Sequence, residues 1–263
     1  MTDSPAPLRE VEVPAPRAPR PSPLVLSVVI PAYNEAAVIA GTVEAVTRYL
    51  RAAGVTHEVL IVDDGSTDRT AEIVEGLATT QPGIRVVRSD HRGKGGAVRH
   101  GVLAATGRYL LFMDADHSTR IETWEQFAPS LRDGYELVIG SRKMPGATIT
   151  VRQTLLRRLM GKGFTWLTNV MLPVRVTDVT CGFKCFRTEV VQAIARLQRI
   201  EGWGFDAELL FLARRTGCRV KELPVVWRND ATTNVRLARD TLRSLTELLR
   251  IRLGAWRGWY GER

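Results

Sequence analysis

Short apolar runs alternate with segments of helical spacing over the first half of the chain. The runs carry few polar residues, which is typical of strands buried on both faces of a parallel sheet. We predict strands at residues 24–30, 58–62, 84–88, 108–113 and 136–139, and helices at 35–53, from 66–68 onward, at 95–105 and at 121–132. Alternation with short connections predicts an α/β fold, in which helices flank a mostly parallel sheet on both faces.

The fourth predicted strand ends abruptly in two carboxylates, Asp114 and Asp116, which are one residue apart. Ligands of open α/β sheets bind at the carboxyl ends of the strands. Two acids at such an end suit a hard divalent cation and the phosphates that it holds. An isolated Asp-x-Asp tripeptide is usually a solvated turn, but the buried strand before it favours the functional interpretation.

Polar or flexible residues also follow the first three predicted strands, at 31–35, 62–66 and 91–96. Four such strand ends on one sheet edge predict a single cleft. Asp63 can accept hydrogen bonds from a base or ribose, and Lys94 can meet a phosphate. The glycines around Lys94 allow a close backbone approach, but their spacing is not that of a phosphate-binding P-loop. We therefore expect a cation to hold the diphosphate.

From residue 142 the chain becomes strongly basic. Residues 142–175 contain seven Lys or Arg and no acid, and within them 151–172 mixes these charges with large apolar residues. This pattern predicts either a helix in a membrane interface or a helix packed on the sheet with a basic outer face. Residues 236–263 repeat it with seven Arg, three acids, two Trp and a Tyr. The two segments together favour interfacial helices, and neither is apolar enough to span a bilayer.

The net charge of +9 implies an anionic partner: nucleic acid, phospholipid or a phosphorylated substrate. Nucleic acid is not expected, because RNA-binding aromatic motifs and zinc spacings are absent from the sequence. The three cysteines are an odd number without a second metal-binding pair, so we expect reduced thiols in a cytoplasmic compartment. Residues 1–23 hold seven of the 13 prolines and are predicted to form a disordered tail.

Seven motifs then occur in the order seen in family 2 glycosyltransferases of the GT-A fold. They are PAYNE (31–35), VDDGSTD (62–68), GKGGAVRHG (93–101), DAD (114–116), GSR (140–142), DVTCGFKCF (178–186) and WGFDAELL (203–210). The resemblance covers about residues 25–230, and the ordered set is far more specific than DAD alone. GSR and TCGFKCF look most like the dolichyl- and polyprenyl-phosphate sugar synthases, and the nearer match is their dolichyl-phosphate β-glucosyltransferase-like branch.

The resemblance implies an inverting, Mg²⁺- or Mn²⁺-dependent transfer from a nucleotide sugar to a polyprenyl or dolichyl phosphate, with a UDP-sugar favoured. We expect a GT-A catalytic domain over residues 24–235, followed by the basic amphipathic helix that the residue pattern predicts over 236–263. Carried over by position, the nucleotide-sugar site comprises Pro31, Tyr33, Glu35, Asp63, Lys94, Asp114, Ala115, Asp116 and Arg228. Asp114 and Asp116 would also hold the metal, and Arg142 and Arg157 would hold the acceptor phosphate, since arginine pairs with phosphate oxygens.

Two departures from the family pattern stand out. Ser118 occupies a place where mannosyl-phosphate synthases often have Gln. The usual Gly-Ser-Lys after the last strand is missing, and Arg228 or Arg236 would replace its lysine. We expect donor specificity to differ in that region.

No Ser-His-Asp or Cys-His set is evident, and an ionised phosphate acceptor needs no strong base. Asp206 and Glu208 lie where relatives with hydroxyl acceptors place a base; here we expect them to orient the sugar or the arginines, or to serve the fold. Transfer to a glycan hydroxyl is the alternative, and a non-catalytic basic binding protein is a weaker one. The enzyme would lie peripherally on the cytoplasmic face of a membrane, with a small membrane partner protein as one option.

Overall fold

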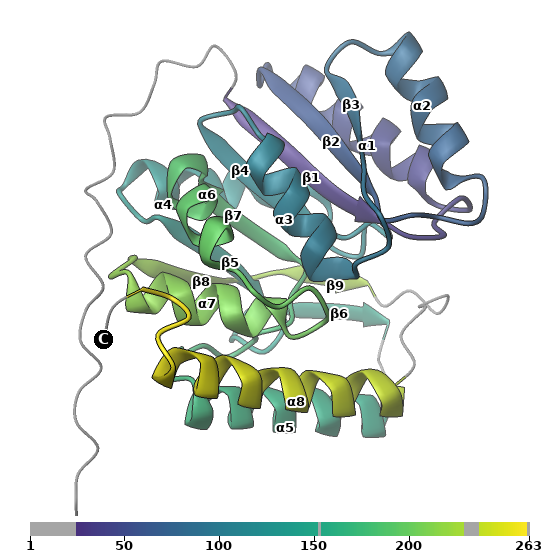
Figure 1. The fold of residues 1–263 in the computed structure, drawn as a ribbon. Coiled ribbons are helices and arrows are strands. Elements are labelled where there is room, and N and C mark those ends of the chain that lie inside the picture. The colour runs from purple at the N-terminus through teal and green to yellow at the C-terminus, as the bar shows by residue number, and fades with distance from the viewer. Residues whose placement is uncertain (1–24, 152–153, 229–236, 262–263) are drawn as a thin grey trace, which may run out of the picture.

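The structure is a computed structural model that describes residues 25–151, 154–228 and 237–261. A seven-stranded sheet with the order β3-β2-β1-β4-β7-β5-β8 forms its centre (Figure 1). The strands of this sheet are β1 (Leu26–Ala32), β2 (His57–Asp63), β3 (Ile84–Arg88), β4 (Tyr109–Met113), β5 (Leu137–Ser141), β7 (Phe183–Arg187) and β8 (Val220–Pro224). Strands β6 (Thr148–Val151) and β9 (Val226–Arg228) pair in a second, two-stranded sheet.

Helices cover both faces of the large sheet, and each face has its own core. The helices are α1 (Ile39–Ala52), α2 (Thr70–Thr80), α3 (Lys94–Ala104), α4 (Trp124–Arg132), α5 (Leu155–Met171), α6 (Thr188–Leu197), α7 (Phe205–Arg215) and α8 (Leu237–Trp256), with a 3₁₀ turn at Ile121–Thr123. Consecutive residues of one strand, such as Val28 and Val29, enter different cores. Alternation of side chains across the sheet explains why the strands read as continuous apolar runs.

The predicted mostly parallel sheet is confirmed. Strand β1 pairs in parallel with β2 and β4, β2 with β3, and β5 with β8. The exception is β7, which lies between β4 and β5 and is antiparallel to both. We did not predict β7, because its sequence FKCFR interrupts the apolar pattern with a lysine that is fully buried.

Two helices begin later than predicted, because the residues before them tie two loops together. The side chain of Asn34 accepts a hydrogen bond from the Thr67 amide, and Asp68 accepts one from the Ala36 amide. Helix α2 begins only at Thr70, whose amide donates to the Asp68 carboxylate. These contacts fix the loops after the first two strands relative to each other.

The basic segment after residue 142 contains the helix α5, as predicted. Helices α5 and α8 contact each other and lie side by side at the base of the molecule (Figure 1). Leu248, Ile251 and the later Tyr260 enter the core on the α3–α7 face of the sheet, so the C-terminal helix is integral to the domain. Among the described helices, none combines the length and apolar character needed to cross a membrane. The proline-rich tail and Arg236 lie outside the described residues.

Candidate active site

The strand ends that carry the sequence motifs meet at one edge of the sheet. Pro31 and Ala32 at the end of β1 pair with Val62 and Asp63 at the end of β2, and both β3 and β4 run parallel to these strands. The amide of Glu35 donates to Thr70 Oγ1 at 2.8 Å, which holds the first motif against α2. The predicted nucleotide-site residues of β1 and β2 are therefore brought together.

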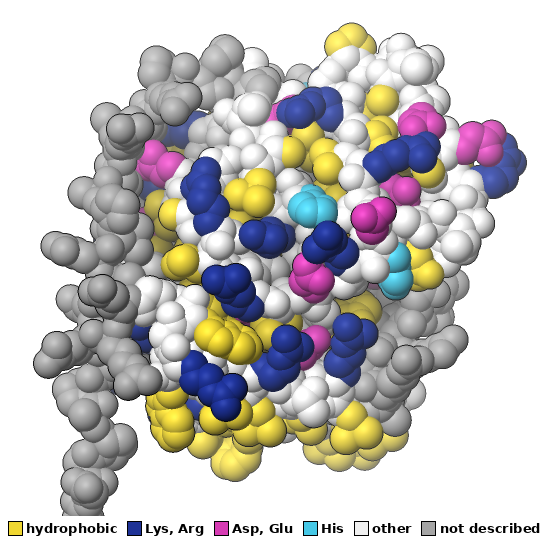
Figure 2. All heavy atoms as spheres, in the orientation of Figure 1, with side chains coloured by type: hydrophobic (Ala, Val, Ile, Leu, Met, Phe, Trp, Pro, Cys, Tyr) yellow, Lys and Arg dark blue, Asp and Glu magenta, His cyan; other side chains and the backbone are white. Residues whose placement is uncertain are grey.

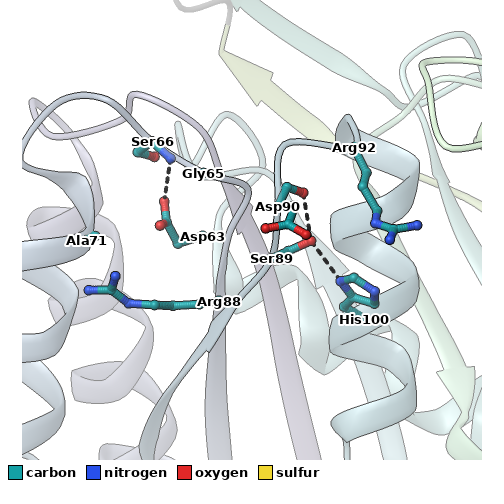
Figure 3. Close-up of a pocket in the computed structure, with 9 residues that line it drawn as sticks. All are labelled: Asp63, Gly65, Ser66, Ala71, Arg88, Ser89, Asp90, Arg92 and His100. Atoms are coloured by element: carbon teal, nitrogen blue, oxygen red, sulfur yellow. Dashed lines mark hydrogen bonds between the residues drawn. The ribbon is translucent and has the colours of Figure 1, made fainter.

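A pocket of about 480 Å³ opens between the ends of β2 and β3 (Figure 3). It is lined by Asp63, Gly65, Ser66, Ala71, Arg88, Ser89, Asp90, Arg92 and His100. Asp63 is almost fully buried and accepts a hydrogen bond from the Ser66 amide, while His100 Nδ1 lies 2.9 Å from Ser89 Oγ. The polar groups that converge here suit a base or ribose.

Two residues near this pocket, Asp64 after β2 and His91 after β3, were not singled out from the sequence. The carboxylate of Asp64 accepts hydrogen bonds from the amides of Arg92 and Gly93 at 3.0 and 2.9 Å. His91 stacks on Tyr33 with ring centroids 4.2 Å apart, and its Nδ1 lies 3.0 Å from Asp64. Asp64 therefore holds the loop that precedes Lys94, and its place inside VDDGSTD was the available signal.

Asp114, the first carboxylate of the acidic motif, is held from two sides. Lys94 Nζ donates to its Oδ1 at 2.7 Å. On the other side lies Gly182, where any added Cβ would collide with the Asp114 carboxylate. Burial alone would lower the pKa of Lys94, but the charges of Asp114 and Asp206 raise it. Lys94 is therefore a charged partner of the acidic motif.

Asp116, the second carboxylate, accepts a hydrogen bond from the Ser118 amide at 2.9 Å. Its pKa is raised, first by burial and then by the nearby charge of Asp114. A divalent cation held by Asp114 and Asp116 would relieve that repulsion, and two hard oxygen ligands would leave coordination positions for a diphosphate. Within the described residues, no group of three or more His, Cys, Asp or Glu side chains is placed to hold a metal ion. The donor set fits Mg²⁺ or Mn²⁺.

Behind the acidic motif, Lys184 and Asp206 form a fully buried ion pair. Lys184 Nζ lies 2.6 Å from Asp206 Oδ1 and also donates to the Cys181 carbonyl. Burial raises the pKa of Asp206, and Lys184 acts in the opposite direction. Sequence reasoning missed Lys184, although a lone lysine in an otherwise apolar strand was the signal. The carboxylate of Asp206 is therefore already paired with the ammonium group of Lys184.

Glu208 lies two residues further along α7, and its carboxylate is bound by groups of the protein. Its carboxylate accepts hydrogen bonds from the amides of Arg199 and Ile200 and from the Tyr260 hydroxyl, the last at 2.6 Å. These three contacts join a loop and the C-terminal segment to α7. The expected sugar-orienting role gains no support from them.

Arg142 directly follows β5, and neighbouring side chains of the protein hold its guanidinium in place. Its Nε and Nη2 donate to the two oxygens of Asp178 at 2.7 and 2.9 Å, and Nη2 also donates to Thr180. The guanidinium lies over the Trp227 ring. Burial would lower the pKa of Arg142, but Asp178 raises it, and the same pairing lowers the pKa of Asp178 to about 2. Asp178, which sequence reasoning left unassigned, is the residue that positions Arg142.

Arg157 lies in the first turn of α5, and Thr154 accepts a hydrogen bond from its amide. Burial and the charge of Arg142 lower the pKa of Arg157, while Asp116 acts in the opposite direction. Arg142 and Asp116 therefore both lie within electrostatic range of Arg157. Helix α5 thus brings the second predicted acceptor arginine to the acidic motif.

The remaining predicted residues lie around this centre. Ala115 is buried, and its carbonyl accepts a hydrogen bond from the Thr42 hydroxyl of α1 at 2.6 Å. The amide of Arg228 donates to the Ser118 carbonyl, so β9 borders the acidic loop while the Arg228 side chain is exposed. The predicted donor-specificity segment that follows Arg228 lies outside the described residues.

Residues 27–195 match the family model described as "Glycosyl transferase family 2". The chain belongs to this family. A dolichyl-phosphate beta-glucosyltransferase of Trichomonas vaginalis is 31% identical over 96% of this chain and 79% of its own length. The corresponding enzyme of Saccharomyces cerevisiae is 31% identical over 91% of this chain and 77% of its own length.

Solved structures show the same fold. Glucosyl-3-phosphoglycerate synthase from Mycobacterium tuberculosis in complex with UDP superposes with a TM-score of 0.65 at 21% identity, covering 88% of this chain and 80% of that one. Its complex with Mn²⁺ and UDP-glucose gives a TM-score of 0.63 at 20% identity, with 88% and 80% coverage. The fold of this family 2 glycosyltransferase is therefore GT-A.

Proposed function

We propose that this glycosyltransferase moves a sugar from a nucleotide sugar, preferably a UDP-sugar, to a polyprenyl or dolichyl phosphate with inversion of configuration. The observation that carries the proposal is that two arginines from separate elements lie within electrostatic range of the acidic motif, Arg142 of Asp114 and Arg157 of Asp116. A cation on one side and arginines on the other can hold a leaving diphosphate and an attacking phosphate together. Arginine makes paired, charge-assisted bonds to phosphate oxygens.

On the donor side, the pocket at Asp63 would hold the nucleoside, and Tyr33 and Glu35 would border it. Asp114 and Asp116 would hold Mg²⁺ or Mn²⁺, which supplies charge neutralisation for the departing diphosphate. Lys94 already faces the motif and would share its charge with the phosphates. The Mn²⁺ and UDP-glucose complex of a structural neighbour agrees with this donor class.

On the acceptor side, the engagement of both predicted base positions favours a phosphate over a glycan hydroxyl. Asp206 is bound by Lys184, and Glu208 is bound by two amides and Tyr260. A hydroxyl acceptor needs a base, whereas a phosphate is ionised at neutral pH. Catalysis then consists of aligning the acceptor oxygen opposite the leaving group and stabilising the charge that develops.

The names of the relatives agree with a dolichyl-type acceptor, and about four-fifths of their length is covered.

Cys181, Cys185 and Cys218 are free thiols, and burial raises the pKa of Cys181 to about 11. Unreactive reduced thiols are consistent with action on the cytoplasmic face of a membrane. A small membrane partner protein would be compatible with this placement.

The test is transfer of radiolabel from a panel of UDP- and GDP-sugars into lipid that organic solvent extracts. The purified protein is incubated with polyprenyl phosphate and Mn²⁺ or Mg²⁺. We expect label from one donor, complete loss with EDTA, and a decrease of at least about 100-fold in Asp116→Asn, since metal-held charge stabilisation is a large catalytic contribution. Label in a soluble glycan and none in lipid would instead establish the hydroxyl acceptor.

A further inference from the structure

Helix α5 exposes a stripe of large apolar side chains. Leu155, Leu159, Trp166 and Val170 follow helical spacing, and Leu155 and Trp166 are 68% and 66% exposed. The opposite side of the helix is anchored, because Phe164, Leu167 and Met171 pack against the core. A soluble helix normally turns its apolar stripe inward. Here the helix has two apolar sides, and only one is covered within the described structure.

Helix α8 repeats this arrangement beside α5. Leu242, Leu249, Leu253 and Trp256 are exposed at spacings of seven, four and three residues, with Leu242 at 65% and Trp256 at 58%. Leu248 and Ile251 on the other side are fully buried. The two helices contact each other, so the two exposed stripes lie on neighbouring helices. We call these eight residues of α5 and α8 the apolar base.

The surroundings of the apolar base are positively charged. In Figure 2 hydrophobic side chains gather along the lower edge, where Figure 1 places α5 and α8, and Lys and Arg side chains border them from above. Arg158, Lys162, Arg250 and Arg257 are exposed on or directly after these helices. Among residues 155–171 and 242–256 the one acid is Glu247, which is buried and bonded to the Gly204 amide.

We propose that the apolar base docks on the surface of a bilayer that contains anionic lipids, with α5 and α8 lying in the interface plane. Leu and Trp side chains would enter the acyl boundary, and the bordering cations would meet lipid phosphates. The charge distribution selects this occupant, because a second copy would bring the same cations against each other. Tryptophan, with an apolar body and a polar N–H, favours the same interface.

The inference adds a geometric link to the proposed function, and in this part it rests on that function. Arg157, proposed to hold the acceptor phosphate, lies in the first turn of α5, on the side of the helix opposite to the stripe that contains Leu155 and Leu159. A bilayer that supports α5 would therefore lie within about one helix diameter of the acceptor site. A lipid phosphate would reach Arg157 while its hydrocarbon tail stays among the other lipids.

The test is flotation of the full chain with vesicles of phosphatidylcholine and phosphatidylglycerol. Two double variants remove part of the apolar base, Leu249→Gln with Leu253→Gln and Trp166→Gln with Val170→Gln. The matched control is Leu103→Gln on α3, where the leucine is exposed but lies outside the apolar base. We expect the wild type and the control to float, and each double variant to bind about 10- to 100-fold more weakly, because each lost apolar side chain weakens insertion.

A second assay separates docking from chemistry, using a water-soluble short-chain prenyl phosphate as acceptor. The double variants should transfer sugar to it at the wild-type rate, while losing activity on long-chain acceptor in vesicles. Undiminished flotation of the variants would overturn the docking, as would a dimer in light scattering that the variants convert to a monomer. Wild-type protein that floats but transfers to neither acceptor would sustain the docking and contradict the proposed function.

Discussion

At the scale of single residues, the position of Asp114 depends on a glycine as much as on a lysine. Lys94 binds the carboxylate from one side, and Gly182 leaves room for it on the other. In Gly182→Ala the new methyl group would push Asp114 out of its place. We expect transfer activity to fall by at least about 10-fold, since small displacements of catalytic groups are costly. The Mn²⁺ concentration for half-maximal rate should rise.

The measurement is a Mn²⁺ titration of the initial rate. The matched control is Gly161→Ala in α5, where an added Cβ meets nothing within 4 Å. That substitution should leave the Mn²⁺ requirement unchanged. An unchanged titration in Gly182→Ala would show that Asp114 does not contribute to the metal site.

A second prediction concerns the pair that fixes Arg142. Asp178→Asn removes the buried charge that binds two guanidinium nitrogens. We expect the free energy of unfolding to fall by about 3–5 kcal/mol, because a buried cation loses its partner. The KM for the acceptor should rise more than kcat falls, since Arg142 would no longer be held toward the phosphate.

Urea unfolding and acceptor titrations measure the two effects, with Glu75→Gln as control. Glu75 pairs with Arg88 at the surface, where such pairs contribute under about 1 kcal/mol. The pKa of Asp178 is lowered from 3.8 to about 2, so the pair stabilises the protein above about pH 4 and loses this contribution as the pH falls toward 2. The difference between wild type and Asp178→Asn should therefore narrow below pH 4. A constant difference would contradict the assignment.

At the scale of elements, the sequence predicted those strands, helices and site residues that apolar periodicity and the motifs at strand ends indicate. Strands β1 to β5 and helices α3 and α5 follow from local patterns, as does the gathering of Asp63, Lys94 and the acidic motif at one edge. Strand β7 did not follow, because Lys184 looks exposed until Asp206 is placed beside it by the fold. The pairing of Arg142 with Asp178, 36 residues apart, likewise requires tertiary structure.

Helix α7 and the segment after α8 are joined by one buried hydrogen bond, from Tyr260 to Glu208. Tyr260→Phe should lower the free energy of unfolding by about 1–3 kcal/mol, because a buried carboxylate loses a donor. The rate with a water-soluble acceptor should stay unchanged, since Glu208 serves the fold. Tyr49→Phe is the matched control: its hydroxyl bonds Glu125 at the exposed surface, and its loss should cost less than about 1 kcal/mol. A large loss of kcat in Tyr260→Phe would restore a substrate-orienting role to Glu208.

At the scale of the whole molecule, different helices cover the two cores. Helices α1, α2 and α4 cover the core that includes Val28. The core that includes Val29 is covered by α3, α6 and α7 together with Leu248, Ile251 and Tyr260 from the C-terminal segment. Deletion of residues 237–263 should therefore expose apolar surface and destabilise the domain. We expect dye binding to exposed apolar surface and cleavage by proteases at lower temperature than in the full chain. A truncated protein of unchanged melting temperature would show that α8 is dispensable for folding.

Helix α5 carries both an apolar stripe and Arg157, and this has a kinetic consequence. If the helix rests on the bilayer, the enzyme samples its acceptor by lateral diffusion in two dimensions. Its rate would then follow the mole fraction of acceptor among the lipids, and adding inert lipid would slow turnover at constant total acceptor. The nucleotide sugar would still arrive from bulk water. The rate would therefore depend on the bulk concentration of the donor and on the surface density of the acceptor in the bilayer.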